Sequence, residues 1–433
     1  SRRFASMAEC HLLADQYTVT FRQDGEMALQ TGISTDIWDI NGPHLFGFGC
    51  QAGEVLTVSA VTGEKGIRVA AAHAAVYTDL DGVDPVRAAE ALCRTAQARG
   101  FDACLEAHRA AWEEIWARSE VLLEGDDAAA LALRASQYHL NCIAPRHAEN
   151  LSIPARGLSG QTYKGAIFWD SEIFFFPMFV YTQPAIARSL LRYRIETLPG
   201  ALRKAAEYGC RGAFYPWESQ EGGAEGCTNF NVVDVFTHRP VRTYFRDKQI
   251  HISGDIAYAL RQYCEITGDR SLLEEGGAEV ILQCARFYLS RASAHLDSGT
   301  VDFADVIGPD EYHERVTNNA FTNRMIRHCL DSALLLKEIF ADEPEWFAAL
   351  LRELDYARDW ALIADLRGRI RQPRVRDGIL EQFDGYFDLE DCSLSEVRSR
   401  LRDPREYWGG DHGVAGVTQI IKQADVIALM ALL

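Results

Sequence analysis

One short stretch of the chain, Gly308 to Glu314, holds three carboxyl groups, a tyrosine and an imidazole directly after a Gly-Pro turn. The amides of Asn318, Asn319 and Asn323 follow closely. This composition suits a loop that grips a polyhydroxylated ligand and places a carboxyl group, here Glu311, at a bond to be broken. A solvated turn is the alternative interpretation.

Two further stretches place an aromatic ring beside a carboxylate. They are Trp169-Asp170, within Phe168 to Glu172, and Trp217-Glu218, within Tyr215 to Ser219. An indole can form a flat platform against a sugar ring, and a carboxylate can accept two hydroxyl hydrogen bonds. A core tryptophan beside a helix-capping acid fits the same pattern, so each pair alone leaves both interpretations open.

Two weaker candidates are Lys422-Gln423 and His251. Lys422 and Gln423 stand near the start of an expected apolar helix, in which Ile420, Ile421 and their apolar neighbours would supply buried surroundings. A Lys-Gln pair is usually helix surface. His251 either orients a ligand or caps the helix that follows it.

Other common chemistries lack their motifs. The sequence has no phosphate-loop, Gly-x-Ser-x-Gly or His-Glu-x-x-His pattern. A metal held by Glu311, His313 and Glu314 would lack further evident ligands, so we expect no metal. A formal net charge of −18 and a pI near 5.1 argue against nucleic acid as a partner.

The elements that must position these residues fall into three segments: residues 1–84, 85–126 and 127–433. The first favours short strands such as Tyr17 to Phe21 and Val55 to Ala60, which indicates the end of an antiparallel β domain. The second has helical spacing and is expected to be a linker. The third predicts an array of helices with long polar loops at one rim.

Helix signals are clearest from Ser253 to Thr267, where Ser253 can cap the helix and Gly268 can end it. Further helices are expected near residues 128–144, 185–208, 277–294, 320–340 and 415–433. The eleven cysteines lack CxxC spacing, which predicts buried free thiols and a reducing, cytoplasmic location. No apolar run is long enough to span a membrane.

Taken in order, seven motifs resemble glycoside hydrolase family 65, which includes maltose, kojibiose, nigerose and trehalose phosphorylases. The motifs are Gly157 to Gly160, Phe168 to Glu172, Leu198 to Ala201, Tyr215 to Ser219, His251 to Ser253, Ile307 to Glu314 and Ile421 to Asp425. The resemblance implies an (α/α)6 barrel, apparently incomplete at its C-terminal end, preceded by a helical linker and the tail of an antiparallel β-sandwich. It also implies a homodimer without an organic cofactor.

By position in these motifs, Glu311 matches the family's general acid. Trp169, Asp170, Lys422 and Gln423 match residues that hold the glucosyl unit beside the cleaved bond, and Trp217, Glu218 and His251 are added as substrate-binding candidates. The resemblance implies that inorganic phosphate attacks the anomeric carbon with inversion and gives β-glucose 1-phosphate.

The resemblance places a Ser-rich phosphate-binding loop after the Lys422-Gln423 segment, beyond Leu433. An inverting hydrolase of the same family is therefore an alternative, and a non-catalytic glucoside-binding barrel is a second one. The leaving sugar would be read by loops such as Gln220 to His238 and Asp384 to Trp408, whose sequences do not name it.

Overall fold

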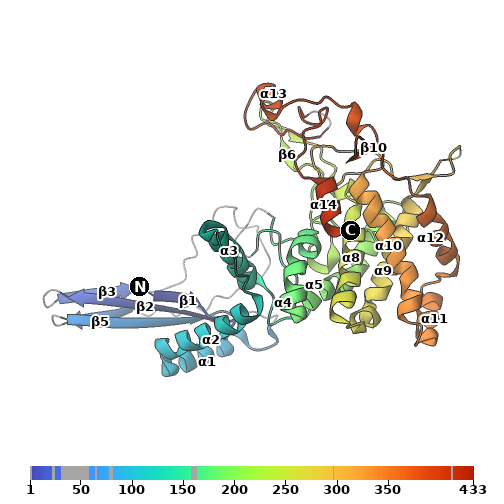
Figure 1. Cartoon of the computed structure of the whole chain (residues 1–433). Coiled ribbons are helices and arrows are strands. Elements are labelled where there is room, and N and C mark those ends of the chain that lie inside the picture. Colours follow the sequence, from blue (N-terminus) through green and yellow to red (C-terminus); the bar gives the residue numbers. More distant parts are fainter. Residues whose placement is uncertain are drawn as a thin grey trace. The chain divides into compact units, whose positions relative to one another are not determined.

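A computed structural model describes most of the chain, and the described residues divide into two compact units, 1–134 and 135–433 (Figure 1). The described ranges are 2–21, 25–30, 58–63, 66–77, 81–157, 163–295, 297–410 and 413–433. Two expected features fall partly outside them: residues 55–57 of an expected strand and residues 158–160 of the first motif. The expected three-segment division stays a prediction.

The first unit combines antiparallel strands with helices. Strands β1 (Arg2–Ala5), β2 (Leu12–Phe21) and β5 (Gly66–Ala75) form a sheet in the order β1-β2-β5, and β3 (Gly25–Gln30) pairs with β4 (Val58–Gly63). All these pairings are antiparallel, and β2 contains the strand expected at Tyr17 to Phe21.

Two helices follow, α1 (Pro85–Arg99) and α2 (Phe101–Ser119). Asp84 caps α1 because its carboxylate accepts a hydrogen bond from the Arg87 amide at 3.1 Å. Pro85 occupies the first turn of α1, where its missing N–H has no cost. Gly100, with φ of 85°, separates the two helices.

The second unit is mainly helical, which confirms the expected fold class. Its helices, after α3 (Asp127–Ile143), are α4 (Phe176–Thr182), α5 (Pro184–Glu196), α6 (Leu198–Glu207), α7 (Phe245–Lys248), α8 (His251–Thr267), α9 (Ala278–Arg291), α10 (Ala320–Ile339), α11 (Pro344–Glu353), α12 (Ala357–Arg369), α13 (Leu394–Ser399) and α14 (Asp425–Leu432). A π-helical turn, η3 (Ser171–Phe175), precedes α4.

Helix α8 lies at the centre of the second unit. Its first ten residues are all buried, which is expected for a helix covered on every side. It packs against α4, α5, α9 and α10 (Figure 1). Gly268 ends α8 in the left-handed conformation, as expected. Ser253 is not its cap, because α8 begins at His251 and the Ser253 hydroxyl instead donates to the Ala213 carbonyl.

Two other helix expectations need correction. The helix expected at 185–208 is two helices, α5 and α6, and Pro199 stands in the first turn of α6. The helix expected at 415–433 begins only at Asp425. The Lys422 amide donates to the Asp310 carboxylate at 2.9 Å, so this backbone is tied to another loop and not to a helical turn. Lys422 and Gln423 therefore lie in the loop before α14. Their expected apolar surroundings are also partly wrong, because Ile421 and Ile427 are exposed.

Short backbone bridges hold the loops that carry the predicted site residues. Ile167 pairs with Ser219, and Val306 pairs with Val316. The second bridge closes the base of a hairpin whose far end is the Gly308 to Glu314 stretch. That stretch is thus a loop, as expected, and it directly precedes α10.

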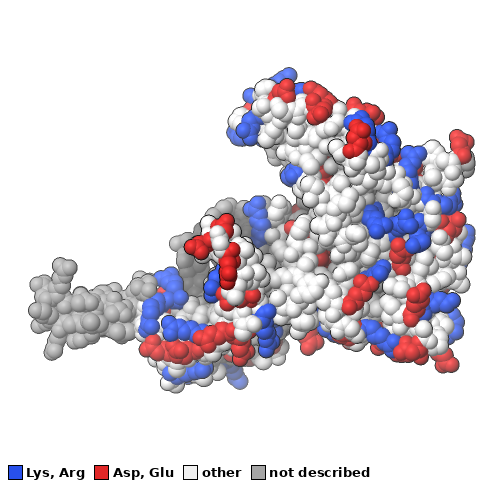
Figure 2. All heavy atoms as spheres, in the orientation of Figure 1, with Lys and Arg blue, Asp and Glu red and all other residues white. Residues whose placement is uncertain are grey.

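The cysteines match the expectation of buried free thiols only in part. All ten described cysteines are free thiols, but only four are buried, and Cys10 and Cys142 are exposed. On the face shown in Figure 2, acidic and basic side chains are interspersed over the second unit. No helix in the described part of the chain combines the length and apolar character that a membrane span requires.

A fully buried ion pair stands under the segment that carries Trp169 and Asp170. The Arg194 Nε and Nη2 atoms donate to the two Glu172 carboxylate oxygens at 2.8 and 2.9 Å, and neither side chain is exposed. Nη2 also donates to the Phe168 carbonyl at 2.9 Å. The pair thereby joins α5 to both ends of the Phe168 to Glu172 segment.

Replacing Arg194 by methionine is expected to destabilise the protein by about 3–5 kcal/mol, because it leaves the Glu172 carboxylate buried without its counter-ion. Urea unfolding followed by circular dichroism measures this. Arg369→Met is the matched control, because Arg369 pairs with Asp365 at the surface, where an ion pair contributes about 0–1 kcal/mol. Equal losses in the two variants would contradict the proposed importance of the buried pair.

Candidate active site

The structure brings Glu311 together with Lys422 and Gln423, which lie 111 and 112 residues further along the chain. The Lys422 ammonium donates to Glu311 Oε2 at 2.5 Å, and the Glu311 amide donates to Gln423 Oε1 at 3.1 Å. The Glu311 side chain is 17% exposed and that of Lys422 is 41% exposed. Both groups are therefore open to a ligand. The Glu311 carboxyl lies within reach of the Lys422 ammonium, and the Glu311 backbone is held by the Gln423 amide oxygen.

Asp310 holds this arrangement from below. Its Oδ1 accepts hydrogen bonds from the Lys422 and Tyr312 amides at 2.9 and 3.1 Å. Its Oδ2 faces His313 Nδ1 at 2.6 Å and accepts from Gln382 Nε2 at 2.8 Å. Burial alone would raise the pKa of Asp310, but the hydrogen bonds and the nearby His313 lower this pKa below its ordinary value. Asp310 is a buried carboxylate that joins the Glu311 loop to the Lys422 segment.

Asp425, the first residue of α14, grips the same loop from the opposite direction. Its Oδ1 accepts the Asp310 amide at 2.6 Å, and its Oδ2 accepts Asn319 Nδ2 at 2.7 Å. Complete burial raises the pKa of Asp425 to about 8, and the charge of Asp310 adds to the rise. A Cβ atom on Gly308 would lie 2.3 Å from Asp425 Oδ2, so the approach of the two segments requires glycine there.

Trp169 and Asp170 lie at the entry to η3, half-buried. The Trp169 ring contacts His251 and Phe321 edge-on, with centroids 5.0 and 6.1 Å apart. Burial raises the pKa of Asp170, and the charge of Glu311 contributes to the rise. The charges of the Asp170 and Glu311 carboxyl groups therefore influence each other.

His251 is placed differently from the expectation that it meets substrate or caps the next helix. Its side chain is fully buried within the first turn of α8, and its Nδ1 lies 2.7 Å from Asp255 Oδ2. Its ring packs between Trp169 and Phe321. His251 has no exposed surface for a ligand, and its place is that of a support behind the Trp169 indole.

Trp217 and Glu218 also lie in the interior. The Trp217 ring stacks on Phe245 and meets Phe168 edge-on, with centroids 5.1 and 4.9 Å apart. Burial raises the pKa of Glu218, and the Lys164 ammonium, 3.7 Å away, opposes the rise. The Ile167–Ser219 bridge brings this segment beside Trp169, but the structure does not place either side chain against Glu311. Their substrate contact stays a prediction.

The loop before residue 410 adds residues to the site that the motifs did not assign. Tyr407 donates from its hydroxyl to the Glu311 carbonyl at 2.9 Å, and Trp408 stacks on Tyr312 with centroids 6.2 Å apart. A Cβ on Gly409 would lie 2.8 Å from the Tyr312 Cα atom. The aromatic and glycine content of this loop was the available signal, and it marked the loop without giving the contact.

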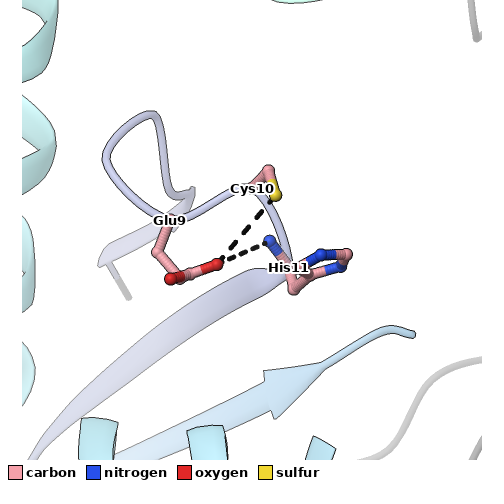
Figure 3. A group of neighbouring side chains, drawn as sticks. All are labelled: Glu9, Cys10 and His11. Carbon is pink, nitrogen blue, oxygen red and sulfur yellow. Dashed lines mark hydrogen bonds between the residues drawn. The ribbon is translucent and has the colours of Figure 1, made fainter. Parts of the chain in front are cut away.

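Both ring nitrogens of His313, a possible metal ligand of the loop, already have partners. His313 Nδ1 faces Asp310, and its Nε2 lies 2.8 Å from the Thr418 carbonyl. Among the described residues, the group with ligand atoms close enough for a metal is Glu9, Cys10 and His11, within 4.8 Å of one another. Figure 3 shows this group in the turn before β2, in the first unit.

The helical fold and the carboxyl-centred site are those of a carbohydrate-active enzyme domain. Residues 134–433 match the glycosyl hydrolase family 65 central catalytic domain. The chain belongs to this family, which confirms the resemblance drawn from the motifs.

Individual relatives carry phosphorylase and hydrolase names. The nigerose phosphorylase of Lachnoclostridium phytofermentans is 43% identical, over 100% of this chain and 66% of its own length. The 1,2-alpha-glucosylglycerol phosphorylase of Bacillus selenitireducens is 37% identical, over 99% of this chain and 61% of its own length. The kojibiose hydrolase of Flavobacterium johnsoniae is 33% identical, over 70% of this chain and 40% of its own length.

A solved structure shares the fold. It is a “Putative kojibiose phosphorylase from human microbiome”, with a TM-score of 0.81 and 21% sequence identity, over 99% of this chain and 60% of that chain. The chain thus spans 66% or less of the length of each of these proteins.

The raised pKa of Asp425 predicts a pH-dependent stability. Between its ordinary value of 3.8 and about 8, the native carboxyl keeps a proton that the unfolded chain has released. The contribution of this group to the free energy of unfolding therefore falls as pH rises through that window.

Asp425→Asn cannot release a proton, so the stability of the wild type minus that of the variant is expected to shrink from about pH 4 to about pH 8. Urea unfolding of both proteins at several pH values in this range measures the difference. A difference that grows with pH would show that Asp425 is ionised in the folded protein.

Proposed function

We propose that the chain carries the catalytic carboxyl of a glycoside phosphorylase that cleaves an α-linked glucose disaccharide with inorganic phosphate, giving β-glucose 1-phosphate and a released sugar. The observation that supports this most is the convergence of Glu311, Lys422 and Gln423, with Asp170 close enough for its pKa to respond to Glu311. These are the residues whose roles the family motifs imply.

In the proposed reaction Glu311 is the general acid. It donates its proton to the glycosidic oxygen as the bond breaks, and phosphate attacks the anomeric carbon from the opposite face. The C–O bond to the leaving sugar breaks, a C–O bond to phosphate forms, and the configuration inverts. No organic cofactor is required.

The glucosyl unit would be held by Trp169, Asp170, Lys422 and Gln423. The Trp169 indole offers a platform supported from behind by His251, and the Asp170 carboxylate accepts hydroxyl hydrogen bonds. The Lys422–Glu311 ion pair must open for the reaction, because Lys422 would then bind sugar oxygens while Glu311 takes up its proton. Sugar binding and readiness of the acid are thereby linked.

The names of the relatives agree on the transferred group, an α-glucosyl unit, but differ in the leaving group. Nigerose and kojibiose both contain an α-linked glucosyl group, as does 1,2-α-glucosylglycerol, whose leaving group is glycerol. We therefore propose an α-glucosyl donor and leave the leaving group to experiment. A cytoplasmic homodimer is proposed with it.

The hydrolase named above supports a second candidate, an inverting α-glucoside hydrolase in which water replaces phosphate. Proton NMR of reactions with a panel of α-linked glucose disaccharides, with and without phosphate, separates the two. We expect β-glucose 1-phosphate to form only with phosphate. Release of β-glucose without phosphate would show that the protein is a hydrolase. Binding of a disaccharide without any turnover would support a non-catalytic glucoside-binding barrel.

Glu311→Gln is expected to lower turnover by about 10²–10⁴-fold, the usual contribution of a general acid, while disaccharide affinity changes little. Turnover is measured by product NMR, and affinity is measured by calorimetry. Glu338→Gln is the control, because Glu338 is exposed near the end of α10. A Glu311→Gln variant that keeps wild-type turnover would exclude Glu311 as the acid.

A further inference from the structure

A cavity lies in the second unit, and the residues of the candidate active site do not line it. It has a volume of about 300 Å³ and is walled by Tyr208, Arg242, Tyr244, Arg246, Asp247 and Lys248, with Asn229 at its edge. Trp169, Asp170, Glu311, Lys422 and Gln423 do not line it. The walls come from the end of α6, from α7 and from the segment before α7.

The cavity concentrates positive charge in an acidic chain. Arg242, Arg246 and Lys248 line it together with one carboxylate, Asp247, and Lys248 also pairs with Asp305 outside the wall at 2.6 Å. Three cations therefore meet two acids, although the whole chain has a net charge of −18. Asp247 is 8% exposed, and it accepts hydrogen bonds from Arg242 and from the Tyr208 hydroxyl. Its charge is thus directed into the wall, and the cavity keeps an excess of cationic groups.

Two of these cations are held in place before any ligand arrives. The Arg242 guanidinium lies over the Tyr244 ring, 4.6 Å from its centroid, and Arg246 Nη1 donates to the Cys227 carbonyl at 3.3 Å. Arg246 Nε is buried and, within the described residues, has no hydrogen-bond partner, although Asp247 Oδ1 lies 3.7 Å away. Buried donors of this kind normally have a partner, and a phosphate oxygen in the cavity would supply one.

We propose that this cavity binds a phosphate monoester of a polyol, such as a sugar phosphate. Guanidinium groups match the geometry of phosphate oxygens and can bind them through two N–H groups at once. The Tyr208 and Tyr244 rings and the Asn229 amide suit the polyol part. The volume lies at the lower end of the range for small-molecule pockets, about 300–1,000 Å³.

The site adjoins the base of the hairpin that carries Glu311. The Lys248 ammonium donates to Asp305 Oδ2 at 2.6 Å, and the Lys248 carbonyl accepts the Ile307 amide at 3.0 Å. The proposal goes beyond the phosphorolysis proposed above and does not depend on it, because it concerns a different set of side chains.

Calorimetry of the 433-residue chain at low ionic strength tests the proposal, with glucose 6-phosphate, glucose 1-phosphate, inorganic phosphate and glucose as separate ligands. We expect one or both sugar phosphates to bind more tightly than inorganic phosphate and glucose. Equal affinity for inorganic phosphate and the esters would overturn the polyol part. Absence of binding by every phosphate would overturn the site.

Arg246→Gln is expected to weaken sugar phosphate binding about tenfold or more, because charge-assisted hydrogen bonds are lost. Arg239→Gln removes the same charge from an exposed position outside the cavity and is expected to change affinity less than about twofold. Equal loss in the two arginine variants would indicate general electrostatics and would overturn the proposal.

Hydrogen exchange of the unsubstituted chain gives a test that does not depend on a variant folding. Sugar phosphate is expected to slow exchange in residues 225–231 and 242–248. Slower exchange only in residues 308–314 and 420–425 would instead locate the ligand at the candidate active site and overturn the proposed cavity.

Discussion

The carboxylate of Asp310 is the interaction on which the candidate active site depends. It accepts a hydrogen bond from the Lys422 amide, and the Asp310 amide in turn donates to the carboxyl group of Asp425. These two bonds run in opposite directions between the same two segments and fix their register. Glu311 follows directly in the chain, so the positions of its carboxyl group and of the Lys422 ammonium are set by groups that take no part in the proposed chemistry. Burial makes these bonds strong, because water cannot compete for them.

The pKa values of the two carboxyl groups that join these segments, Asp310 and Asp425, are shifted in opposite directions. Asp310 lies among donors, including His313 and Gln382, and its pKa falls. Asp425 has fewer donors in a fully buried place, and its pKa rises. Since two neighbouring buried charges repel each other, this division allows both residues to be held close together. Two neighbouring segments therefore contribute one carboxylate, Asp310, and one carboxyl group that resists ionisation, Asp425.

Much of the site could be predicted because its signals are local. Glu311 stands in a dense polar stretch after a Gly-Pro turn, so composition marked that loop. The Trp169-Asp170 pair left two interpretations open, and the family motifs were needed to favour a sugar site. The contact between Glu311 and Lys422 spans 111 residues, and only the family resemblance indicated it.

His251 shows a different limit of the sequence. Its position in a polar run indicated a ligand contact or a helix cap, whereas the packing of α8 against neighbouring helices buries its side chain completely. Helix ends depended on the same kind of contact, since α14 begins late where its preceding backbone bonds to Asp310. No local pattern in either segment records that partner.

The Lys422–Glu311 ion pair links the hydrogen bonds of Asp310 to the proposed chemistry, because Asp310 positions the backbone of both residues. The Lys422 ammonium lies 2.5 Å from the carboxyl group that would donate the proton in the proposed reaction. The same ammonium is a donor that sugar oxygens can use, and its side chain is 41% exposed, so a ligand can compete for it. Because Asp310 fixes the backbone of Lys422 but leaves its side chain free to turn, the ammonium can leave Glu311 without moving the loop. Binding of the glucosyl unit would thus move the hydrogen bond of the ammonium from Glu311 to a sugar oxygen, while the backbone that carries both residues stays in place.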